Sequence, residues 1–591
     1  MDYYGFYTGE EFEAYNYLGV HCQKDGAVFR TFAPSAERIS VIGEFSGWNE
    51  IPMDKVYDGN FWECEITNAK HGQMYKFRVY KKDGTFTDHS DPYGFYSEVR
   101  PNTASIIYDL SRFAFKDKKW LSKRTADSKA PLNIYEMHFG SWKHNDDGEP
   151  YKYNELAEAV IPYLKENGYN YIELMPLNEY PCDESWGYQA TGFFSATSRY
   201  GEPDELRYFV DKCHQSGIGV ILDFVPVHFA VDDYALWNYD GTPLYEYPHG
   251  DVGHSEWGSC NFMHSRGEVR SFLQSAAYFW LKEFHFDGLR MDAVSNLIYW
   301  QGDSKRGENK MAIDFIRSMN RGIKQCMPDV ILIAEDSSCY KGVTAPIEEG
   351  GLGFDFKWDL GWMNDTLDYF RMPVDERIRN YHRLTFSMMY FYDEKFILPL
   401  SHDENVHGKA TVLQKMNGDY NVKFPQARAM YLYMLCHPGK KLNFMGGEFG
   451  QLREWNEKRE QDWEILKYPN HDAFRHYISE LNQIYLKNNA LYENDFSADG
   501  FKWLDCHSEE LCAYAFVRKS STQTLLAVFN FSDKQLDYSV ETGSIKKLEL
   551  LIDSDFNRFG GSVSEPFAPV ISDKRTTFRL APFSGQLYIA K

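Results

Sequence analysis

Short runs of alternating hydrophobic and polar residues occupy the first part of the chain, from about residue 20 to residue 112. Such runs are typical of β-strands when turn signals such as Ser-Gly, Asp-Gly and His-Gly separate them. The candidate strands lie at residues 27–34, 38–45, 61–67 and 74–80. This pattern predicts a small N-terminal β-sandwich.

From about residue 131, short apolar runs alternate with amphipathic helical stretches. The apolar runs lie at residues 133–139, 171–177, 219–226, 288–294, 330–336, 354–359, 396–401 and 441–446. Helical periods lie between them, for example at residues 154–168, 203–217 and 271–285. Eight strand–helix units in about 330 residues fit a closed (β/α)8 TIM barrel better than an open doubly wound sheet. The strand pattern is weakest at residues 354–359 and 396–401.

β-rich runs return after about residue 490, and no long helical period occurs among them. Examples are residues 510–518, 524–532 and 576–590. The fold class that we expect is therefore α/β, with a (β/α)8 barrel flanked by an N-terminal β-sandwich and a C-terminal all-β domain. The expected limits are residues 1–115 for the N-terminal β-sandwich, 116–488 for the barrel and 489–591 for the C-terminal β-sandwich.

The chain is strongly acidic, with a formal net charge of −23. DNA, RNA and anionic membrane surfaces need a basic face on their partner, so we expect neither a nucleic-acid nor a membrane partner. The sequence has no apolar run long enough for a transmembrane helix, and its acidic, aromatic N-terminus does not look like a signal peptide. Ten scattered cysteines without a CxxC pair indicate reduced thiols, which favours a cytoplasmic protein.

Aromatic residues make up 17% of the chain. Their rings offer flat apolar faces with polar edges, which suit neutral polyhydroxylated ligands such as sugars. Most of these rings are expected in the core, so the aromatic content alone only raises the possibility of a carbohydrate ligand.

Acidic and histidine side chains recur where the expected barrel strands end, which is where such barrels carry their active sites. These residues are Asp223 and His228 at the third strand, Arg290 and Asp292 at the fourth, Glu335 at the fifth, and His402 and Asp403 at the seventh. Asp292, Glu335 and Asp403 are separated by 43 and 68 residues, so only a closed barrel would bring them together.

Grouped carboxylates of this kind suit glycoside hydrolysis or glycosyl transfer. One carboxyl group must be protonated to act as an acid, while a second stays ionised to attack or stabilise an oxocarbenium-like centre. Arg290 lies two residues before Asp292 on the same face of a strand, where its charge would keep Asp292 ionised.

Each of these residues has a simpler interpretation when it is taken alone. A single acid at a strand end is more often a helix N-cap or a surface residue, and His228 and His402 could be structural. The segment 402–407 contains potential metal ligands, but its spacing fits no zinc motif. No ligand cluster of the density that calcium needs is visible, and we expect no metal and no organic cofactor. The recurrence of acidic residues at the ends of four expected strands favours a catalytic role.

Four segments resemble the signature regions of the α-amylase superfamily, glycoside hydrolase family 13. They are residues 223–228, 288–293, 334–336 and 401–404. Others resemble one subgroup, the glycogen (1,4-α-glucan) branching enzymes, namely residues 135–142, 184–189, 398–409, 444–450, 453–456 and 462–463. Residues 43–49 and 91–105 are similar to the carbohydrate-binding-like domain that precedes the barrel in these enzymes. The resemblance covers nearly the whole chain.

The resemblance implies Asp292 as nucleophile, Glu335 as general acid/base and Asp403 as transition-state stabiliser. It also implies a substrate-binding set, which consists of Tyr188, Asp223, His228, Arg290, His402 and Trp455. In a retaining mechanism the Asp292 and Glu335 carboxyl groups would lie about 5–5.5 Å apart.

The resemblance favours a branching transferase whose partner is an α-glucan polymer such as glycogen, amylose or amylopectin. We expect a monomer, although no motif of the sequence determines the oligomeric state. An amylase-type or debranching hydrolase would use the same three acids with water as the acceptor. A glycan-binding protein without activity is disfavoured because all three acids are present. Trp48 and Trp62 of the N-terminal module could bind glucan, although core packing is the commoner fate of such residues.

Overall fold

The computed structural model describes residues 1–591, and the chain divides into two compact units. The first unit comprises Met1–Arg124, His144–Ala159 and Leu174–Phe354, and the second comprises Thr125–Lys143, Val160–Glu173 and Asp355–Lys591. None of the helices combines the length and hydrophobicity needed to span a lipid bilayer.

All eight expected barrel strands are present and form a closed barrel in chain order. They are β10 (Asn133–Met137), β11 (Tyr171–Leu174), β14 (Gly219–Phe224), β17 (Gly288–Met291), β18 (Ile331–Ala334), β19 (Phe356–Trp358), β20 (Phe396–Leu400) and β21 (Lys440–Phe444). Strands such as β14, β17 and β18 are buried along their whole length, which explains their near-continuous apolar sequence. The barrel prediction is confirmed, including β19 and β20, whose sequence pattern was weakest.

Long helices follow every barrel strand except β18, after which only the short 3-10 helix η9 (Ile347–Glu349) precedes β19. The long helices are α3 (Tyr153–Glu166), α4 (Pro203–Gln215), α6 (Gly267–Glu283), α8 (Lys310–Cys326), α9 (Leu360–Arg371), α13 (Tyr420–Cys436) and α14 (Pro469–Lys487). α4 begins with a capping box between Glu202 and Glu205 and has Pro203 at its first position, so its start is fixed by local chemistry.

In the first unit, the N-terminal module consists of two antiparallel sheets. One contains β1 (Gly19–Gln23), β2 (Gly26–Phe32), β6 (Phe61–Thr67) and β5 (Asp54–Val56); the other contains β4 (Ile51–Pro52), β3 (Arg38–Gly43), β7 (Met74–Tyr80), β8 (Phe86–His89) and β9 (Ser105–Ile106). The ring of Phe29 in β2 packs against Tyr75 in β7 with centroids 5.3 Å apart, so the sheets share a core and the β-sandwich prediction is confirmed.

The two tryptophans of this module have different environments. Trp62 is buried and donates its indole N–H to the Ala33 carbonyl at 3.0 Å, so it is a core residue. Trp48 is 43% exposed. Of the two, only Trp48 presents its ring to solvent.

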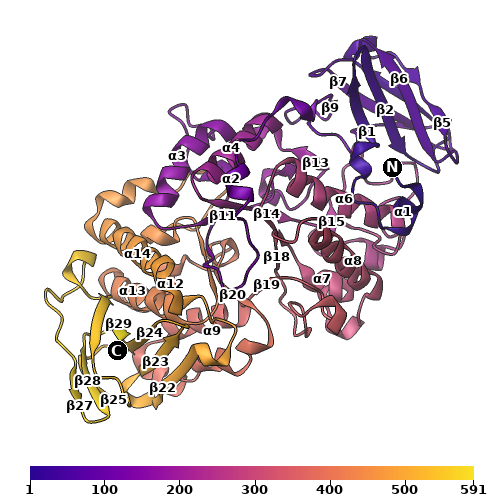
Figure 1. Cartoon of the computed structure of the whole chain (residues 1–591). Helices are drawn as coiled ribbons and strands as arrows, with labels where there is room; N and C mark the ends of the chain where they lie inside the picture. The colour runs from indigo at the N-terminus through magenta and orange to yellow at the C-terminus, as the bar shows by residue number, and fades with distance from the viewer. The chain divides into compact units, whose positions relative to one another are not determined.

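The N-terminal helix α1 (Tyr3–Thr8) lies against α6 within the first unit (Figure 1). The Ser271 hydroxyl donates to the Phe6 carbonyl at 3.0 Å, and the Gln274 amide donates to the Gly9 carbonyl at 2.8 Å. The approach requires glycine at position 267, because a Cβ there would lie 1.8 Å from the Tyr7 carbonyl oxygen. These contacts attach the start of the chain to a barrel helix.

In the second unit, the C-terminal domain also consists of two antiparallel sheets. One contains β22 (Phe501–Ser508), β23 (Ala513–Lys519), β24 (Thr524–Asn530), β29 (Ser584–Ala590) and β26 (Leu548–Asp553); the other contains β25 (Leu536–Glu541), β28 (Arg575–Leu580) and β27 (Val570–Ser572). Phe578 and Tyr588 pack between the sheets, and the outer face of the larger sheet covers α13 through Phe529 and Tyr433 (Figure 1). The C-terminal all-β domain is therefore confirmed.

A buried ionic cluster joins this domain to the barrel strand β21. Arg518 of β23 donates to Asp495 at 2.6 Å and to the Cys436 carbonyl at 2.8 Å, and Lys440 of β21 lies 3.0 Å from Asp495. Burial alone would raise the pKa of Asp495, but Lys440 and Arg518 outweigh burial and hold that pKa below its usual range.

A second buried cluster, formed by Asp117, His214 and Asp287, holds the first unit together away from the strand ends that carry the acids. The two ring nitrogens of His214 lie 2.9 Å from Asp117 and 2.9 Å from Asp287. Asp287 also accepts hydrogen bonds from the Trp120 indole and the Val220 amide. Burial would lower the pKa of His214, but the two carboxylates outweigh it and raise the pKa to about 9.

This cluster makes stability depend on pH in a defined direction. The pKa of His214 is higher in the folded chain than its ordinary value of about 6.5, so its contribution is complete below about pH 6.5 and disappears as pH rises through about 9. We expect His214→Gln to lower the free energy of unfolding at about pH 6 by on the order of 3 kcal/mol, and therefore to lower the thermal midpoint, with a much smaller effect at alkaline pH.

Differential scanning calorimetry of the two proteins across this pH range measures the effect. His476→Gln serves as the control, because His476 is exposed and contacts a single carboxylate, Asp472. A deficit for His214→Gln that did not change with pH would show that His214 is uncharged in the folded chain.

Candidate active site

In the first unit, the site is built around the guanidinium of Arg290, which contacts three carboxylates. Arg290 Nη1 lies 2.8 Å from both oxygens of Asp223 and 2.9 Å from Asp292, and Nη2 lies 3.9 Å from Glu335. Arg290 and Asp223 are each 1% exposed, whereas the Asp292 and Glu335 side chains are 16% exposed. The cation is therefore buried beneath two carboxylates that solvent can reach.

Parallel strand register produces this arrangement. Asp223 in β14 is the register partner of Arg290 in β17, and Arg290 is in turn the partner of Ile333 in β18. Asp292 and Glu335 directly follow the last residues of β17 and β18. The side chains of Arg290 and Asp292 share one face because alternate residues of a strand do so.

The three carboxylates around Arg290 keep its guanidinium protonated. Burial alone would lower the pKa of Arg290, but Asp223, Tyr188, Asp292 and Glu335 outweigh burial, so that pKa lies well above its usual range. The guanidinium therefore stays charged and offsets the repulsion between the neighbouring carboxylates.

A left-handed residue connects the two accessible carboxylates. Ala293 has φ +47°, a conformation that costs free energy for a residue with a Cβ and that is found preferentially at functional sites. This turn directs the Ala293 amide to the Glu335 carboxylate at 2.7 Å, while the Val294 amide donates to the Glu335 carbonyl at 2.9 Å. The backbone after Asp292 thus fixes the position of Glu335.

Tyr188 and His228 complete the part of the site that lies in the first unit. The Tyr188 hydroxyl donates to Asp223 at 2.6 Å, so its ring is tied to the carboxylate that supports Arg290. His228 is buried beside Trp257, and burial lowers the pKa of His228 to about 4. A neutral imidazole both donates and accepts hydrogen bonds, which suits contact with a sugar hydroxyl.

In the second unit, His402 and Asp403 follow β20, and Glu136 of β10 holds His402. The His402 backbone amide donates to Glu136 at 2.9 Å, and its Nδ1 lies 2.5 Å from the other oxygen of the same carboxylate. The remaining ring nitrogen, Nε2, lies 3.5 Å from Asp403. Glu136 and His402 are buried, whereas the Asp403 side chain is 52% exposed.

Trp455 packs beside His402 and is held by the same segment of chain as Glu136. Its indole N–H donates to the Ser141 hydroxyl at 2.8 Å, and that hydroxyl also lies 2.8 Å from His138 Nδ1. The rings of His402 and Trp455 are 6.3 Å apart in an edge-on arrangement. Trp455 is 5% exposed, so only a small part of its ring faces solvent.

Lys415 organises the loop that carries Asp403. Its ammonium group donates to the Glu404 and Ala410 carbonyls and lies 3.6 Å from the Glu404 carboxylate. Burial lowers the pKa of Lys415 to about 8, although Glu404 opposes the change. Lys415 therefore cross-links the loop at two carbonyls.

The predicted site residues fall into two groups, one in each unit. Within the first unit, Tyr188, Asp223, Arg290, Asp292 and Glu335 are linked to one another by direct contacts, and His228 lies in a buried position after β14. Within the second, His402 is adjacent to both Asp403 and Trp455.

Sequence reasoning missed four residues that position these groups: Glu136, Ser141, Ala293 and Lys415. Glu136 and Ser141 lie in the segment 135–142, which resembles the branching enzymes. The sequence therefore pointed to this segment but not to the roles of these two residues.

Family models match three parts of the chain. Residues 17–94 match carbohydrate-binding module 48, described as the isoamylase N-terminal domain. Residues 157–239 match the α-amylase catalytic domain, and residues 503–590 match the α-amylase C-terminal all-beta domain.

Curated relatives match the chain over nearly its whole length, and each of the following is named 1,4-alpha-glucan branching enzyme GlgB. The protein of Fusobacterium nucleatum is 45% identical, with 95% of this chain and 93% of the relative covered. That of Geobacillus stearothermophilus is 43% identical, with 100% and 93% covered. That of Halothermothrix orenii is 44% identical, with 100% and 96% covered.

Solved structures share the fold at lower sequence identity. A putative α-amylase from Salmonella typhimurium superposes with a TM-score of 0.74 at 18% identity, covering 97% of this chain and 100% of that one. A pullulanase from Anoxybacillus sp. LM18-11 gives 0.76 at 17% identity, covering 97% and 87%.

Removal of the buried cation should destabilise the first unit. Arg290→Met removes the cation that neutralises the buried Asp223, and we expect the free energy of unfolding to fall by about 3–5 kcal/mol at neutral pH. Denaturant unfolding monitored by tryptophan fluorescence measures the loss. Addition of Asp223→Asn to Arg290→Met should restore part of the lost stability. Acidification should reduce the difference in stability between Arg290→Met and the wild type, because the carboxylates become protonated.

Arg371→Met is the matched control. Arg371 pairs with Asp368 at 3.2 Å on the surface, where such a pair is worth about 1 kcal/mol or less. Equal effects of Arg290→Met and Arg371→Met would contradict the importance assigned to the buried guanidinium.

Proposed function

The chain belongs to the 1,4-alpha-glucan branching enzyme family, and we propose that it cleaves α-1,4 links in a glucan polymer and transfers the released chain to a 6-hydroxyl group. The product is an α-1,6 branch point in a glycogen- or starch-like glucan. Support comes from relatives of this name that align with 95–100% of the chain. The chemistry is supported by Asp292 and Glu335, which flank a single buried guanidinium.

We assign Asp292 as the nucleophile and Glu335 as the general acid/base. Asp292 lies 2.9 Å from Arg290, and this contact favours the ionised carboxylate that a nucleophile requires. Glu335 lies 3.9 Å from the same guanidinium and accepts a hydrogen bond from Ala293, so its carboxyl group has a fixed position. The retaining mechanism still predicts carboxyl groups about 5–5.5 Å apart.

The reaction proceeds by two displacements at the anomeric carbon. Protonated Glu335 donates its proton to the glycosidic oxygen while the Asp292 carboxylate attacks C1, which releases the reducing-end fragment and leaves a glycosyl ester on Asp292. Ionised Glu335 then removes the proton from the acceptor 6-hydroxyl, and this oxygen displaces Asp292 from C1. Two inversions give net retention.

We assign Asp403 as the stabiliser of the oxocarbenium-like transition state. Asp403 follows β20, Asp292 follows β17 and Glu335 follows β18, and all three strands belong to one closed barrel. Active sites of such barrels are built from the loops at the carboxyl ends of the strands.

The remaining assignments concern the sugar that is cleaved. We propose that Tyr188 stacks on it, that His228 and His402 donate hydrogen bonds to its hydroxyl groups, and that Trp455 borders it. Asp223 supports the site through Arg290, which orients Asp292. A neutral glucan is compatible with the net charge of −23, since it carries no charge to be repelled.

We propose a cytoplasmic location on the basis of the cysteines, all ten of which are free thiols. The monomeric state stays a prediction, as do the particular polymers that serve as substrates.

Amylose distinguishes the transferase from a hydrolase that uses the same acids. We expect incubation to lower iodine absorbance with almost no increase in reducing ends, and isoamylase treatment of the product to release short chains. Asp292→Asn, Glu335→Gln and Asp403→Asn should each reduce the rate at least about a thousandfold while the circular dichroism spectrum is unchanged.

Asp251→Asn changes an exposed acid and should retain full activity. An increase in reducing ends proportional to the loss of iodine colour would reject the transferase in favour of hydrolysis. Substantial turnover by any of the three acid variants would reject the assigned residues.

Glu136 provides a test of how His402 is positioned. Glu136→Gln removes the charge-assisted hydrogen bonds to the His402 ring and amide, and an amide no longer selects the Nδ1–H tautomer. We expect kcat to fall about 10- to 150-fold, since such bonds are worth roughly 1.5–3 kcal/mol, with a smaller change in KM.

Glu480→Gln, which alters an exposed partner of Arg558, should leave both parameters unchanged. An unaltered kcat in Glu136→Gln would show that the orientation of His402 does not depend on this carboxylate.

A further inference from the structure

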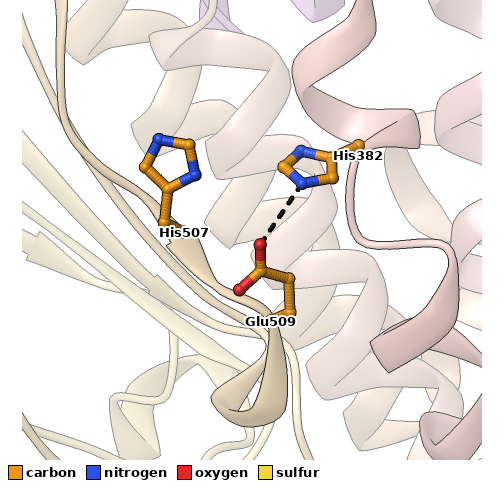
Figure 2. A group of neighbouring side chains, drawn as sticks. All are labelled: His382, His507 and Glu509. Carbon is orange, nitrogen blue, oxygen red and sulfur yellow. Dashed lines mark ion pairs between the residues drawn. The ribbon is translucent and has the colours of Figure 1, made fainter.

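Three metal-ligating side chains converge on the surface of the second unit, outside the site described above. His382 precedes α11 (Arg383–Phe386), His507 lies in β22, and Glu509 begins the short helix η17 (Glu509–Leu511). One donor atom from each lies within 4.8 Å of the other two, and His382 Nε2 is 3.3 Å from the Glu509 carboxylate. Figure 2 shows a ring nitrogen of His507 directed toward the other two residues.

We propose that His382, His507 and Glu509 bind one divalent transition-metal ion, of which Zn²⁺ is the best match. Two imidazole nitrogens and one carboxylate oxygen are ligands for zinc, cobalt and nickel, whereas calcium and magnesium prefer oxygen ligands alone. Donors that share a zinc ion at about 2.0–2.2 Å lie roughly 3.3 Å apart, which is the separation of the His382 and Glu509 atoms.

Packing and hydrogen bonds hold the backbone that carries these ligands. Tyr381, next to His382, is buried and stacks on Tyr514 with ring centroids 4.1 Å apart and planes at 6°. The Tyr514 hydroxyl donates to the Tyr381 carbonyl at 2.9 Å. Ser508, which lies between the other two ligands, donates its amide to the Tyr381 hydroxyl at 3.4 Å. The two ligand-bearing segments are therefore joined by the residues adjacent to the ligands.

Neighbouring groups also orient the individual ligands. His382 Nδ1 lies 3.1 Å from the Thr385 hydroxyl, which leaves Nε2 to face Glu509. Asp505 accepts the His507 amide at 2.9 Å and is itself held by the Ser508 and Tyr538 hydroxyls. A partner on the second ring nitrogen, as Thr385 is for His382, fixes the ring orientation and tautomer of a metal-binding histidine, whereas Asp505 holds the backbone of His507.

A bound ion would join the helical segment around α11 to the first strand of the C-terminal domain. All three side chains are accessible, so an ion can enter from solvent and His507 can move by the small distance that closure needs. In the absence of metal, His382 and Glu509 form a surface pair, which contributes little stability. The metal-bound form should therefore resist unfolding better than the metal-free form.

Isothermal titration of the EDTA-treated, full-length protein with ZnCl₂ tests the proposal. We expect one equivalent to bind to the wild type, with affinity at least about tenfold lower in His507→Asn and in Glu509→Gln. Zn²⁺ should raise the thermal midpoint of the wild type and have no such effect in these variants. His476→Asn is the matched control: His476 is an exposed histidine whose only ion-pair partner is Asp472, and the variant should bind Zn²⁺ as the wild type does.

Cobalt separates this donor set from the thiols of the chain. Cys506 lies 3.8 Å from His507 Nε2, so a thiolate ligand must be tested directly. We expect the Co²⁺ complex to lack a thiolate-to-metal charge-transfer band and Cys506→Ser to bind normally. The proposal is overturned if the wild type binds no Zn²⁺, if His507→Asn and Glu509→Gln bind as tightly as the wild type, or if binding is lost in Cys506→Ser.

Discussion

A guanidinium placed among carboxylates is the interaction on which the candidate site depends. Asp223 is buried, and Asp292 and Glu335 lie close to it at the ends of neighbouring strands. Without a cation, each carboxylate would favour protonation of the others. Arg290 cannot lose its proton under physiological conditions, so the positive charge is permanent. The parallel register that pairs Asp223 with Arg290 is therefore as important to the chemistry as the acids themselves.

In the second unit, carboxylate and hydroxyl groups position the site residues. Glu136 uses both oxygens on His402, and Ser141 connects His138 to Trp455. Tyr135, from the same segment, donates its hydroxyl to the buried Glu448 at 2.9 Å. The segment 135–142 thus contributes contacts that position other residues rather than reacting groups. For this reason the sequence resemblance covers the segment, although no catalytic or binding role was assigned to its residues.

The fold could be predicted further than the site. The periodicity of hydrophobic residues and the positions of turn-forming residues were sufficient to locate the eight barrel strands and both β-domains. Buried parallel strands and sandwich strands both have strong local sequence patterns. The contacts of Glu136 with His402 and of Ser141 with Trp455 could not be predicted, since these partners lie more than 260 residues away. The left-handed turn at Ala293 has no sequence signal, because alanine rarely adopts that conformation. Local patterns also could not separate the buried Trp62 from the exposed Trp48.

The pairing of β10 with β21 has a consequence for synthesis of the chain on the ribosome. Asn133 is the register partner of Lys441, about 300 residues later. At roughly 5–20 residues per second, β10 would wait about 15–60 s for this partner. During that interval one edge of an apolar strand has unpaired backbone groups, which are prone to join another chain. Yield of active protein should therefore depend on translation speed and on chaperones that shield this edge.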